Sequence, residues 1–399
     1  MARTGVTVKL QDTAIGTSSS NEGVAMLVLP VSSASPLIDT PVLVASLEEA
    51  QKLGGYSTLD AGAKFQVSEF YSKAGSGSKL WLVGYDYSKE KGISAIQMPG
   101  IKQAIRQTTA TTLWDNRPRL IGFVYPSNTT VPTSGLAEDL TKSKGAIQNV
   151  QGLIQDMFAE SYRMVAVLDA GRIGQDINNL PSGDTYNAYG VALALTTPDP
   201  TYTADVGRAL GILAGINPAQ SIGQMTLGSV SPVDYFVNAT TANAASNVAV
   251  VSRSIIDDIG AKQYLFTRTR PGNSGVYYND GATLNKSTNA LSAIEFVRVA
   301  NGVCDDAEYY FQQLINTQVP VTASGDIDAG YKSAILATFR SNYIQPRLSR
   351  GDASEIEVTL EAKDGNFVKS RAFAITIRIL PNATLREAFI TTFFVTSLE

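Results

Sequence analysis

The chain has 399 residues, of which 44 % are hydrophobic and 17 % charged, so it is long enough for two or three folded domains and is not expected to be disordered. A formal net charge of -4 gives no indication of a nucleic-acid partner. Histidine is absent and Cys304 is the only cysteine, which excludes histidine-dependent nucleophiles, the common zinc sites and an intrachain disulfide.

The first 20 residues predict an extended arm on a tether. Val6, Val8 and Leu10 lie on one face of a short strand in "GVTVKL", and the polar spacer "GTSSSNEG" follows. The next apolar run, "GVAMLVLPV", has neither the basic start nor the cleavage site of a signal peptide, and no run approaches about 18 apolar residues. We therefore expect no membrane insertion and a protein that stays in an aqueous compartment.

Alternating strands and helices are predicted next. "AMLVLPV", "PVLVAS" and "KLWLVGY" are typical of buried strands, and Ser46 with Glu49 forms a capping box that opens the short helix "LEEAQKL", closed by Gly54 and Gly55. A second helix, ended by "GSGS", carries an apolar stripe. The stripe consists of Ala63, Val67, Phe70, Tyr71 and Ala74.

The middle of the chain continues this alternation. "RLIGFVY" and "MVAVLDA" predict strands covered on both faces, with a helix between them that includes Ile147 and Ile154. This pattern indicates βαβ units and an α/β fold. After a further helix with Val206, Leu210 and Leu213, the low-complexity tract "NATTANAASN" predicts a domain boundary near residue 245.

The last third has a different pattern. "VAVVS" and "QYLFTR" predict strands, and Asp280-Gly281 suits a tight turn. Two helices follow, one with an apolar stripe and one around Ile335, Phe339 and Tyr343. The stripe consists of Val297, Ala300, Cys304, Ala307, Phe311 and Leu314. "EIEVTLEA" and "AFAITIRI" then alternate as a hairpin turned by "AKDGN" and ended by Pro381.

Few residues suggest chemistry. "GSGSKL" lacks the spacing of a phosphate-binding loop. Asp169 follows an apolar strand, where α/β enzymes often place a carboxylate, but a loop-bracing role is favoured because no second catalytic group stands nearby. Asp305 and Asp306 point about 100° apart on a helix, which favours a solvated face over a metal site, and Cys304 is expected in the core. We assign no catalytic, cofactor or metal residue.

The final stretch, "REAFITTFFVTSLE", predicts an apolar strand. Phe389, Thr391, Phe393 and Val395 alternate along one face. An exposed apolar edge strand invites pairing, so we expect this strand and the one at Val6 to Leu10 to add to sheets of neighbouring subunits. An arm at each end generates an open polymer. The alternative is that both are ordinary strands of their own domain.

Two regions carry a family resemblance. The first is "SLEEAQKLGGYSTLDAGAKFQVSEFYSKAGSGSKLWLVGYD", and the second comprises "ALSAIEFVRVANGVCDDAEYYFQQLIN", "AILATFRSNYIQPRL", "EIEVTLEAKDGNFVKSRAFAITIRILP" and the last strand. In order and spacing they resemble the contractile tail sheath proteins of myophages, tailocins and related contractile injection systems. The chain departs from that family in lacking a Trp near Leu47 and in having "INTQVP" where an "FEPN"-like turn is usual.

The resemblance implies an α/β protein with an α+β inner domain, an inserted α/β outer domain and terminal β-arms. It places arms at 1–20 and 382–399, a mainly outer domain at 21–245 whose first strands are candidates for either domain, and the inner sheath domain at 246–381. It also implies a structural subunit, not an enzyme, that polymerises helically around an inner tube and shortens to drive the tube through a target envelope.

The expected partners are further copies of the chain, the inner tube protein, and baseplate and tail-terminator proteins, with no cofactor, nucleic acid or membrane insertion. Assembly in the bacterial cytoplasm, as part of a virion tail or injection particle, is expected. Two alternatives stay open: a non-contractile shell or surface protein, and an α/β enzyme with a site near Asp169.

Overall fold

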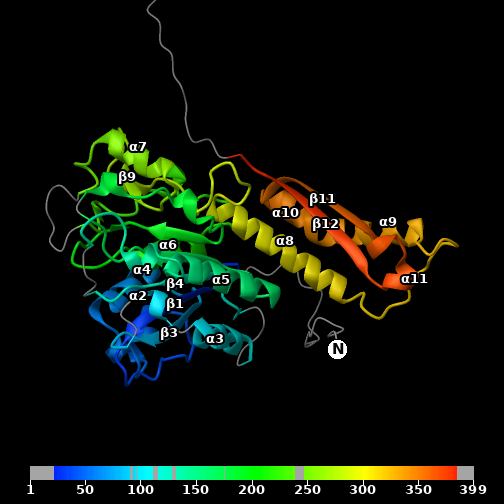
Figure 1. Ribbon diagram of the computed structural model, residues 1–399, viewed down its shortest axis with the longest axis horizontal. Coiled ribbons are helices and arrows are strands. Elements are labelled where there is room, and N and C mark those ends of the chain that lie inside the picture. The colour runs from blue at the N-terminus through cyan, green and yellow to red at the C-terminus, as the bar shows by residue number, and fades with distance from the viewer. Residues whose placement is uncertain are drawn as a thin grey trace, which may run out of the picture.

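The computed structural model describes residues 22–89, 93–96, 98–110, 116–127, 132–174, 176–238 and 247–383. The molecule is elongated, with a larger unit and a smaller one joined by the long helix α8, Ile294–Gln312 (Figure 1). One hydrophobic core includes residues from Val24 to Val297, and a second includes residues from Val299 to Ala362. We call the two parts the sheet unit (described residues up to 297) and the hairpin unit (described residues from 299).

A six-stranded sheet of order β2-β3-β1-β4-β5-β6 forms the centre of the sheet unit. Its strands are β1 (Ala25–Val31), β2 (Val42–Val44), β3 (Leu80–Asp86), β4 (Leu120–Phe123), β5 (Val165–Asp169) and β6 (Val191–Ala194). All neighbours are parallel except β2 and β3. Because β1 lies between β3 and β4, the first strands belong to the sheet unit.

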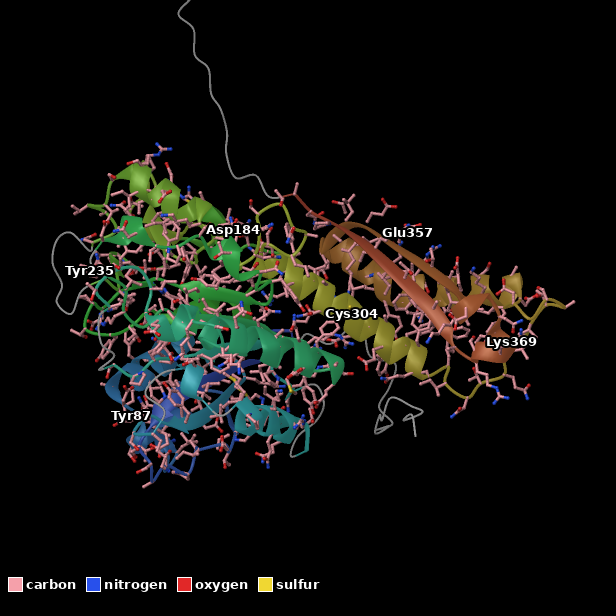
Figure 2. All side chains as sticks on the ribbon, viewed as in Figure 1. Tyr87, Asp184, Tyr235, Cys304, Glu357 and Lys369 are labelled. Atoms are coloured by element: carbon pink, nitrogen blue, oxygen red, sulfur yellow. The ribbon has the colours of Figure 1, made fainter. Side chains whose placement is uncertain are left out.

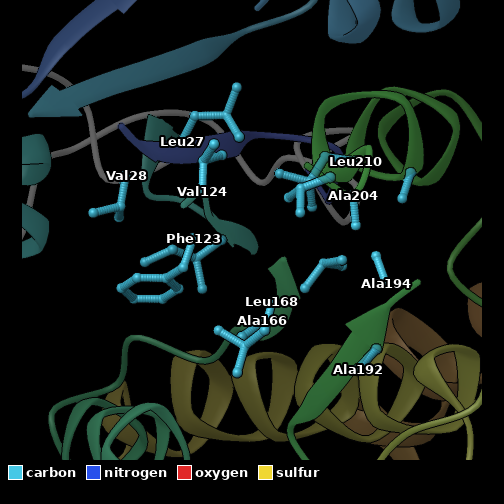
Figure 3. Packing of buried hydrophobic residues seen from close by; sticks show 14 of the residues in the cluster. Leu27, Val28, Phe123, Val124, Ala166, Leu168, Ala192, Ala194, Ala204 and Leu210 are labelled. Atoms are coloured by element: carbon cyan, nitrogen blue, oxygen red, sulfur yellow. The ribbon is translucent and has the colours of Figure 1, made fainter. Parts of the chain in front are cut away.

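Two pairs of helices pack against this sheet. One pair is α2 (Ala61–Ala74) with α6 (Val206–Gly215), and the other is α3 (Met98–Ala110) with α5 (Ala146–Ala159). Figure 3 shows Leu210 of α6 in the same apolar cluster as Leu27 and Phe123 of the sheet. Every residue of β1, β3, β4, β5 and β6 is buried, as the continuous apolar runs predict.

Helices α2 and α6 approach closely at a glycine. A Cβ added at Gly207 would overlap the backbone carbonyl of Gln66. The Gln66 side chain spans the contact, since its Oε1 accepts from the Gly207 amide at 2.6 Å and its Nε2 donates to the Ala204 carbonyl at 2.9 Å. A side chain at position 207 is therefore incompatible with this helix packing.

The sheet unit also contains short elements at its periphery. They are α1 (Leu47–Lys52), α4 (Glu138–Thr141), β7 (Thr196–Thr197), β8 (Tyr235–Phe236), α7 (Arg253–Ala261), β9 (Thr267–Thr269) and β10 (Val276–Tyr278). At α1 the expected N-cap is confirmed, because Ser46 Oγ accepts from the Glu49 amide at 3.1 Å. Helices α3 and α7 were not predicted.

Of the two strands predicted after the low-complexity tract, the first is wrong and the second is confirmed in part. "VAVVS" forms a turn, because the Asn247 side chain accepts from the Ala249 amide and the Asn247 carbonyl accepts from Val250. The hairpin of β9 and β10 turns through residues 270–275, and Asp280-Gly281 follows β10 outside that turn. In "QYLFTR" only the end forms β9, while Leu265 makes an isolated bridge to Ala194.

The hairpin unit contains the end of α8, then α9 (Ala329–Phe339), a π-helical turn over 340–344, α10 (Gln345–Arg350), β11 (Ala353–Ala362), α11 (Phe367–Ser370) and β12 (Phe373–Pro381). Strands β11 and β12 pair antiparallel, with Val358 opposite Ile377. The predicted alternation and the end at Pro381 are confirmed. The connection is longer than the expected "AKDGN" turn because it includes α11.

The tract at residues 238–247 does not coincide with a division of the hydrophobic packing. Residues beyond it, including Ile256, Phe266 and Ile294, are buried in the first core together with the strands of the sheet. The two cores meet within α8, between Val297 and Val299. The two hydrophobic cores therefore divide about 50 residues after this tract, because the helix and strands that follow it return to the sheet unit.

Candidate functional site: the terminal hairpin and the α8 junction

The β11–β12 hairpin presents two strand edges with no β-partner among the described residues. On the face toward the helices, the β11 side chains of Ile356, Val358 and Leu360 are buried. The corresponding β12 row is only half-buried, although it is equally apolar: Phe373, Ile375, Ile377 and Ile379. The difference follows from position, because no described strand pairs with the outer edge of β12, whereas β11 contacts α9 and α10.

The edge of β11 is partly protected. Arg340 Nη2 donates to the Val358 carbonyl at 3.2 Å. The solvent face of β11 carries exposed Glu355, Glu357 and Glu361, and Glu357 pairs across the hairpin with Arg378 at 3.1 Å (Figure 2 labels Glu357). Charged side chains are usual on an exposed sheet face. The half-buried apolar row on β12 is different, because a strand added at that edge would bury it.

Both ends of the described chain lie at the base of this hairpin. Glu22 contacts Arg350 at 3.4 Å, and Asn382 Nδ2 donates to the Gly351 carbonyl at 2.6 Å. Ser354 Oγ also donates to Asn382 Oδ1 at 2.7 Å. The first and the last described residues thus lie close to one region of the hairpin unit. The predicted arm residues themselves (Val6, Val8, Leu10, Phe389, Thr391, Phe393 and Val395) lie outside the described residues.

A first group of ion pairs joins α8 to the sheet unit. Asp305 on α8 contacts three arginines of the sheet unit: Arg117 at 2.9 Å, Arg163 at 2.6 Å, and Arg119. Arg163 also contacts Glu308, one turn further along α8, at 2.5 Å. All of these side chains are largely buried, so their charges interact in a weakly screened environment.

A second group joins α8 to the hairpin unit and to Glu22. Arg347, which is 2 % exposed, contacts Asp306 at 2.5 Å, Glu22 at 3.1 Å and Asp352 at 3.2 Å. The guanidinium passes next to Gly302, where an added Cβ would lie 2.6 Å from Arg347 Nη1 and 2.9 Å from Glu22 Oε1. Glycine at position 302 therefore allows this ion pair to cross α8.

The expectation that Asp305 and Asp306 form a solvated helix face is wrong. The angular separation of adjacent helical residues, about 100°, places Asp305 toward the sheet unit and Asp306 toward the hairpin unit. Each carboxylate is buried against arginines that are distant in sequence. Burial raises the pKa of Asp306, and Arg347 opposes that shift.

A sequence signal for part of this group exists. Arg119 directly precedes β4 and Arg163 closely precedes β5, and the two strands are parallel neighbours with Leu120 opposite Val165. The residues before two such strands meet at one edge of the sheet, which brings their guanidinium groups together. The acidic partner on α8 required the tertiary fold and could not be found from spacing.

The other candidate residues have structural roles. Asp169 is fully buried and accepts from the backbone amides of Tyr125 (3.0 Å), Gly171 (2.7 Å) and Ala204 (2.9 Å), so the loop-bracing interpretation is confirmed. Burial raises its pKa to about 6. Cys304 lies near the middle of α8 (Figure 2), is half-buried, and has a pKa raised by burial, which disfavours the reactive thiolate.

The remaining features carry no ligand chemistry. "GSGSKL" ends α2 with Gly75 and Gly77 at positive φ, as a helix-ending loop requires. In the described part of the chain, no group of three or more acidic or cysteine side chains is placed to hold a metal ion. None of the helices among the described residues combines the length and apolarity needed to cross a bilayer.

Comparison with known proteins gives one family and one fold. The family profile described as "DUF2586, N-terminal domain" matches residues 3–282. Curated protein sequences contain no match to the chain.

Solved structures match over almost the whole chain. The helical sheath of the anti-feeding prophage in the contracted state is similar with a TM-score of 0.59 and 12 % identity, covering 100 % of both chains. The contracted sheath complex of the extracellular contractile injection system PVC gives 0.57 and 13 %, covering 100 % of this chain and 98 % of that one. A sheath tail protein from Desulfitobacterium hafniense gives 0.51 and 9 %, covering 95 % and 100 %. These likenesses show the fold of contractile sheath proteins.

Proposed function

This chain belongs to the DUF2586 family, and on that premise we propose that it is a structural subunit of a contractile tail sheath. The observation that carries the proposal is a sheath-protein fold, matched from end to end, whose terminal hairpin has edges without a strand partner among the described residues and lies beside both ends of the described chain. Such a subunit polymerises helically around an inner tube and shortens to drive that tube through a target envelope. It has no catalytic role.

Subunits join by exchanging strands with the hairpins of their neighbours. The half-buried row on β12 favours addition of the apolar arm that contains Phe389, Thr391, Phe393 and Val395 at that edge, because large side chains there would cover the aliphatic row. The arm with Val6, Val8 and Leu10 adds at β11, whose exposed glutamates suit its Lys9. Each backbone hydrogen bond gives about 1 kcal/mol net, and apolar burial adds roughly 25 cal/mol per Å².

The hairpin unit faces the tube and the sheet unit faces outward in this proposal. The convergence of Glu22 and Asn382 at the base of the hairpin supports an inner position for the arms, which must connect neighbours around a narrow circumference. The inner tube protein, baseplate proteins and tail-terminator proteins are the further partners. Assembly takes place in the bacterial cytoplasm, and the product is a virion tail or an injection particle.

Contraction is a rigid-body rearrangement of subunits. The buried ion pairs on both sides of α8 favour movement of the two units together, since their separation would leave charges unpaired. The arms bend instead, at the spacer from Gly16 to Gly23 and at the link from Pro381 to Thr384. The driving energy is stored at assembly.

Electron microscopy of the purified chain, with and without a co-expressed inner tube protein, tests the proposal. We expect hollow helical tubes, and a comparison of extended and shortened tubes should show intact strand additions with unchanged unit folds. Closed shells would support a non-contractile container instead. Uniform monomers at high concentration and several salt conditions, with the tube protein present, would contradict any polymeric function.

A further inference from the structure

A small cavity lies where α8, the sheet unit and Glu22 meet. It has a volume of about 20 Å³ and is lined by Glu22, Arg119, Arg163, Pro218, Arg298, Asn301 and Gly302. A volume of roughly 10–15 Å³ accommodates one water-sized species, so this cavity admits a single small ion or water. Its walls come from five separate parts of the chain.

The charges around the cavity are unevenly matched. Three guanidinium groups line it, from Arg119, Arg163 and Arg298, against one carboxylate, Glu22. The two oxygens of Glu22 already contact Arg347 at 3.1 Å and Arg350 at 3.4 Å.

The other nearby carboxylates, Asp305 and Glu308, also contact arginines already. Asp305 contacts Arg117, Arg119 and Arg163, and Glu308 contacts Arg163. The pKa of Arg119 is held well below its usual value by burial first and then by the positive charge of neighbouring arginines. The arginines that line the cavity therefore outnumber its one lining carboxylate.

Arg298 is the least satisfied of the lining residues. It is 6 % exposed, and its Nη2 makes only long contacts, 3.4 Å to the Glu22 carbonyl and 3.5 Å to the Ile216 carbonyl. Its Nη1 is buried without a hydrogen-bond partner in the described part of the chain. Burial lowers the pKa of Arg298 to about 10, so the side chain stays cationic at neutral pH. A buried cationic donor of this kind normally has a partner.

We propose that the cavity binds a small monovalent anion of the chloride class between Arg298, Arg119 and Arg163. The anion accepts hydrogen bonds from guanidinium groups of both the sheet unit and α8, and so ties them together beside Glu22, which follows the N-terminal arm in sequence and contacts Arg347 and Arg350 of the hairpin unit. The site is independent of polymerisation, because every lining residue belongs to one subunit.

Thermal unfolding of the full chain at constant ionic strength tests this site. Sodium chloride replaces sodium gluconate, whose anion is too large for the cavity. At a chloride concentration ten times Kd we expect Tm to rise by roughly 1–2 °C. Arg298→Gln should lose this chloride-specific rise. The matched control, Arg350→Gln, removes an arginine of the same network that does not line the cavity and should keep it.

Two further measurements keep the proposal falsifiable if Arg298→Gln folds poorly. Asn301→Asp is nearly isosteric and adds a negative charge to the cavity wall, so it too should abolish the chloride effect. Chlorine NMR line broadening reports binding directly and should decrease in both variants. Equal Tm in chloride and gluconate, with no line broadening by the wild-type chain, means that the cavity holds water and overturns the proposal. Broadening that persists in both variants places the anion elsewhere and also overturns it.

Discussion

Removal of Arg347 should strongly destabilise the subunit. In Arg347→Met the carboxylates of Asp306, Asp352 and Glu22 lose their shared partner, although their side chains are only 12 %, 0 % and 17 % exposed. Breaking a buried pair costs about 3–5 kcal/mol. With an unfolding entropy of about 2.1 cal/mol/K per residue, this corresponds to a decrease in Tm of roughly 4–6 °C for a single transition. The comparison variant is Arg350→Met, whose side chain is 31 % exposed and should cost about 1 kcal/mol or less.

The pH dependence of this variant provides a second readout. Burial raises the pKa of Asp306, and without Arg347 that pKa rises further. A carboxyl group whose folded-state pKa exceeds its unfolded value destabilises the fold as pH rises through the folded-state pKa. The difference between Arg347→Met and wild type, measured by urea denaturation, should therefore be smaller at mildly acidic than at neutral pH. Equal losses in Arg347→Met and Arg350→Met at neutral pH would refute a stabilising role for the buried arginine.

Three other substitutions test the strand arms, the helix packing and a buried acid. Phe393→Pro should prevent tube formation but leave the melting curve of the subunit unchanged. Ile377→Pro, in the centre of the hairpin, should prevent tube formation and also lower Tm. Equal melting defects of the two variants in circular dichroism would show that the last strand belongs to its own subunit. Gly207→Ala should cost about 1–3 kcal/mol by forcing α2 and α6 apart, while Gly215→Ala, in the same helix with open space around it, should be neutral or slightly stabilising in the same denaturation assay. The pKa of Asp169 is raised to about 6 by burial, so its contribution to stability should decrease as pH rises from about 4 through 6, and Asp169→Asn should remove that slope. A slope that persists in Asp169→Asn would assign it to another group.

Sequence patterns were sufficient for elements that bury a regular apolar face. The strands around Leu27 and Leu168 and the alternation of β11 were predictable, because period and burial coincide there. The stripe predicted on α8 was wrong: apart from Val297 its members are only half-buried, and α8 instead buries Val299, Val303 and Tyr310 in the second core. The prediction failed where a local polar contact replaced a strand, as at Asn247. It also failed for α3, whose apolar stripe was not recognised.

The ionic groups at α8 show a different limit. Asp305 and Asp306 are adjacent in sequence, yet their partners at Arg163 and Arg347 are far away on either side of the chain. Composition and spacing show which residues are charged, but not which of them form ion pairs. Their pairing depends on the position of α8 between two cores, and this position is a property of the complete fold.

The opposite directions of Asp305 and Asp306 also restrict changes in chain length. An inserted residue within α8 rotates everything after it by about 100° and advances it by about 1.5 Å. An insertion before Asp305 would move that residue away from Arg163, while one after Asp306 would move the hairpin unit, and with it Arg347, away from Asp306. Homologous chains of different length should therefore place their insertions outside Ile294–Gln312, for example in the turn at 270–275, and the separation of the two units should be among the most constant dimensions of the family.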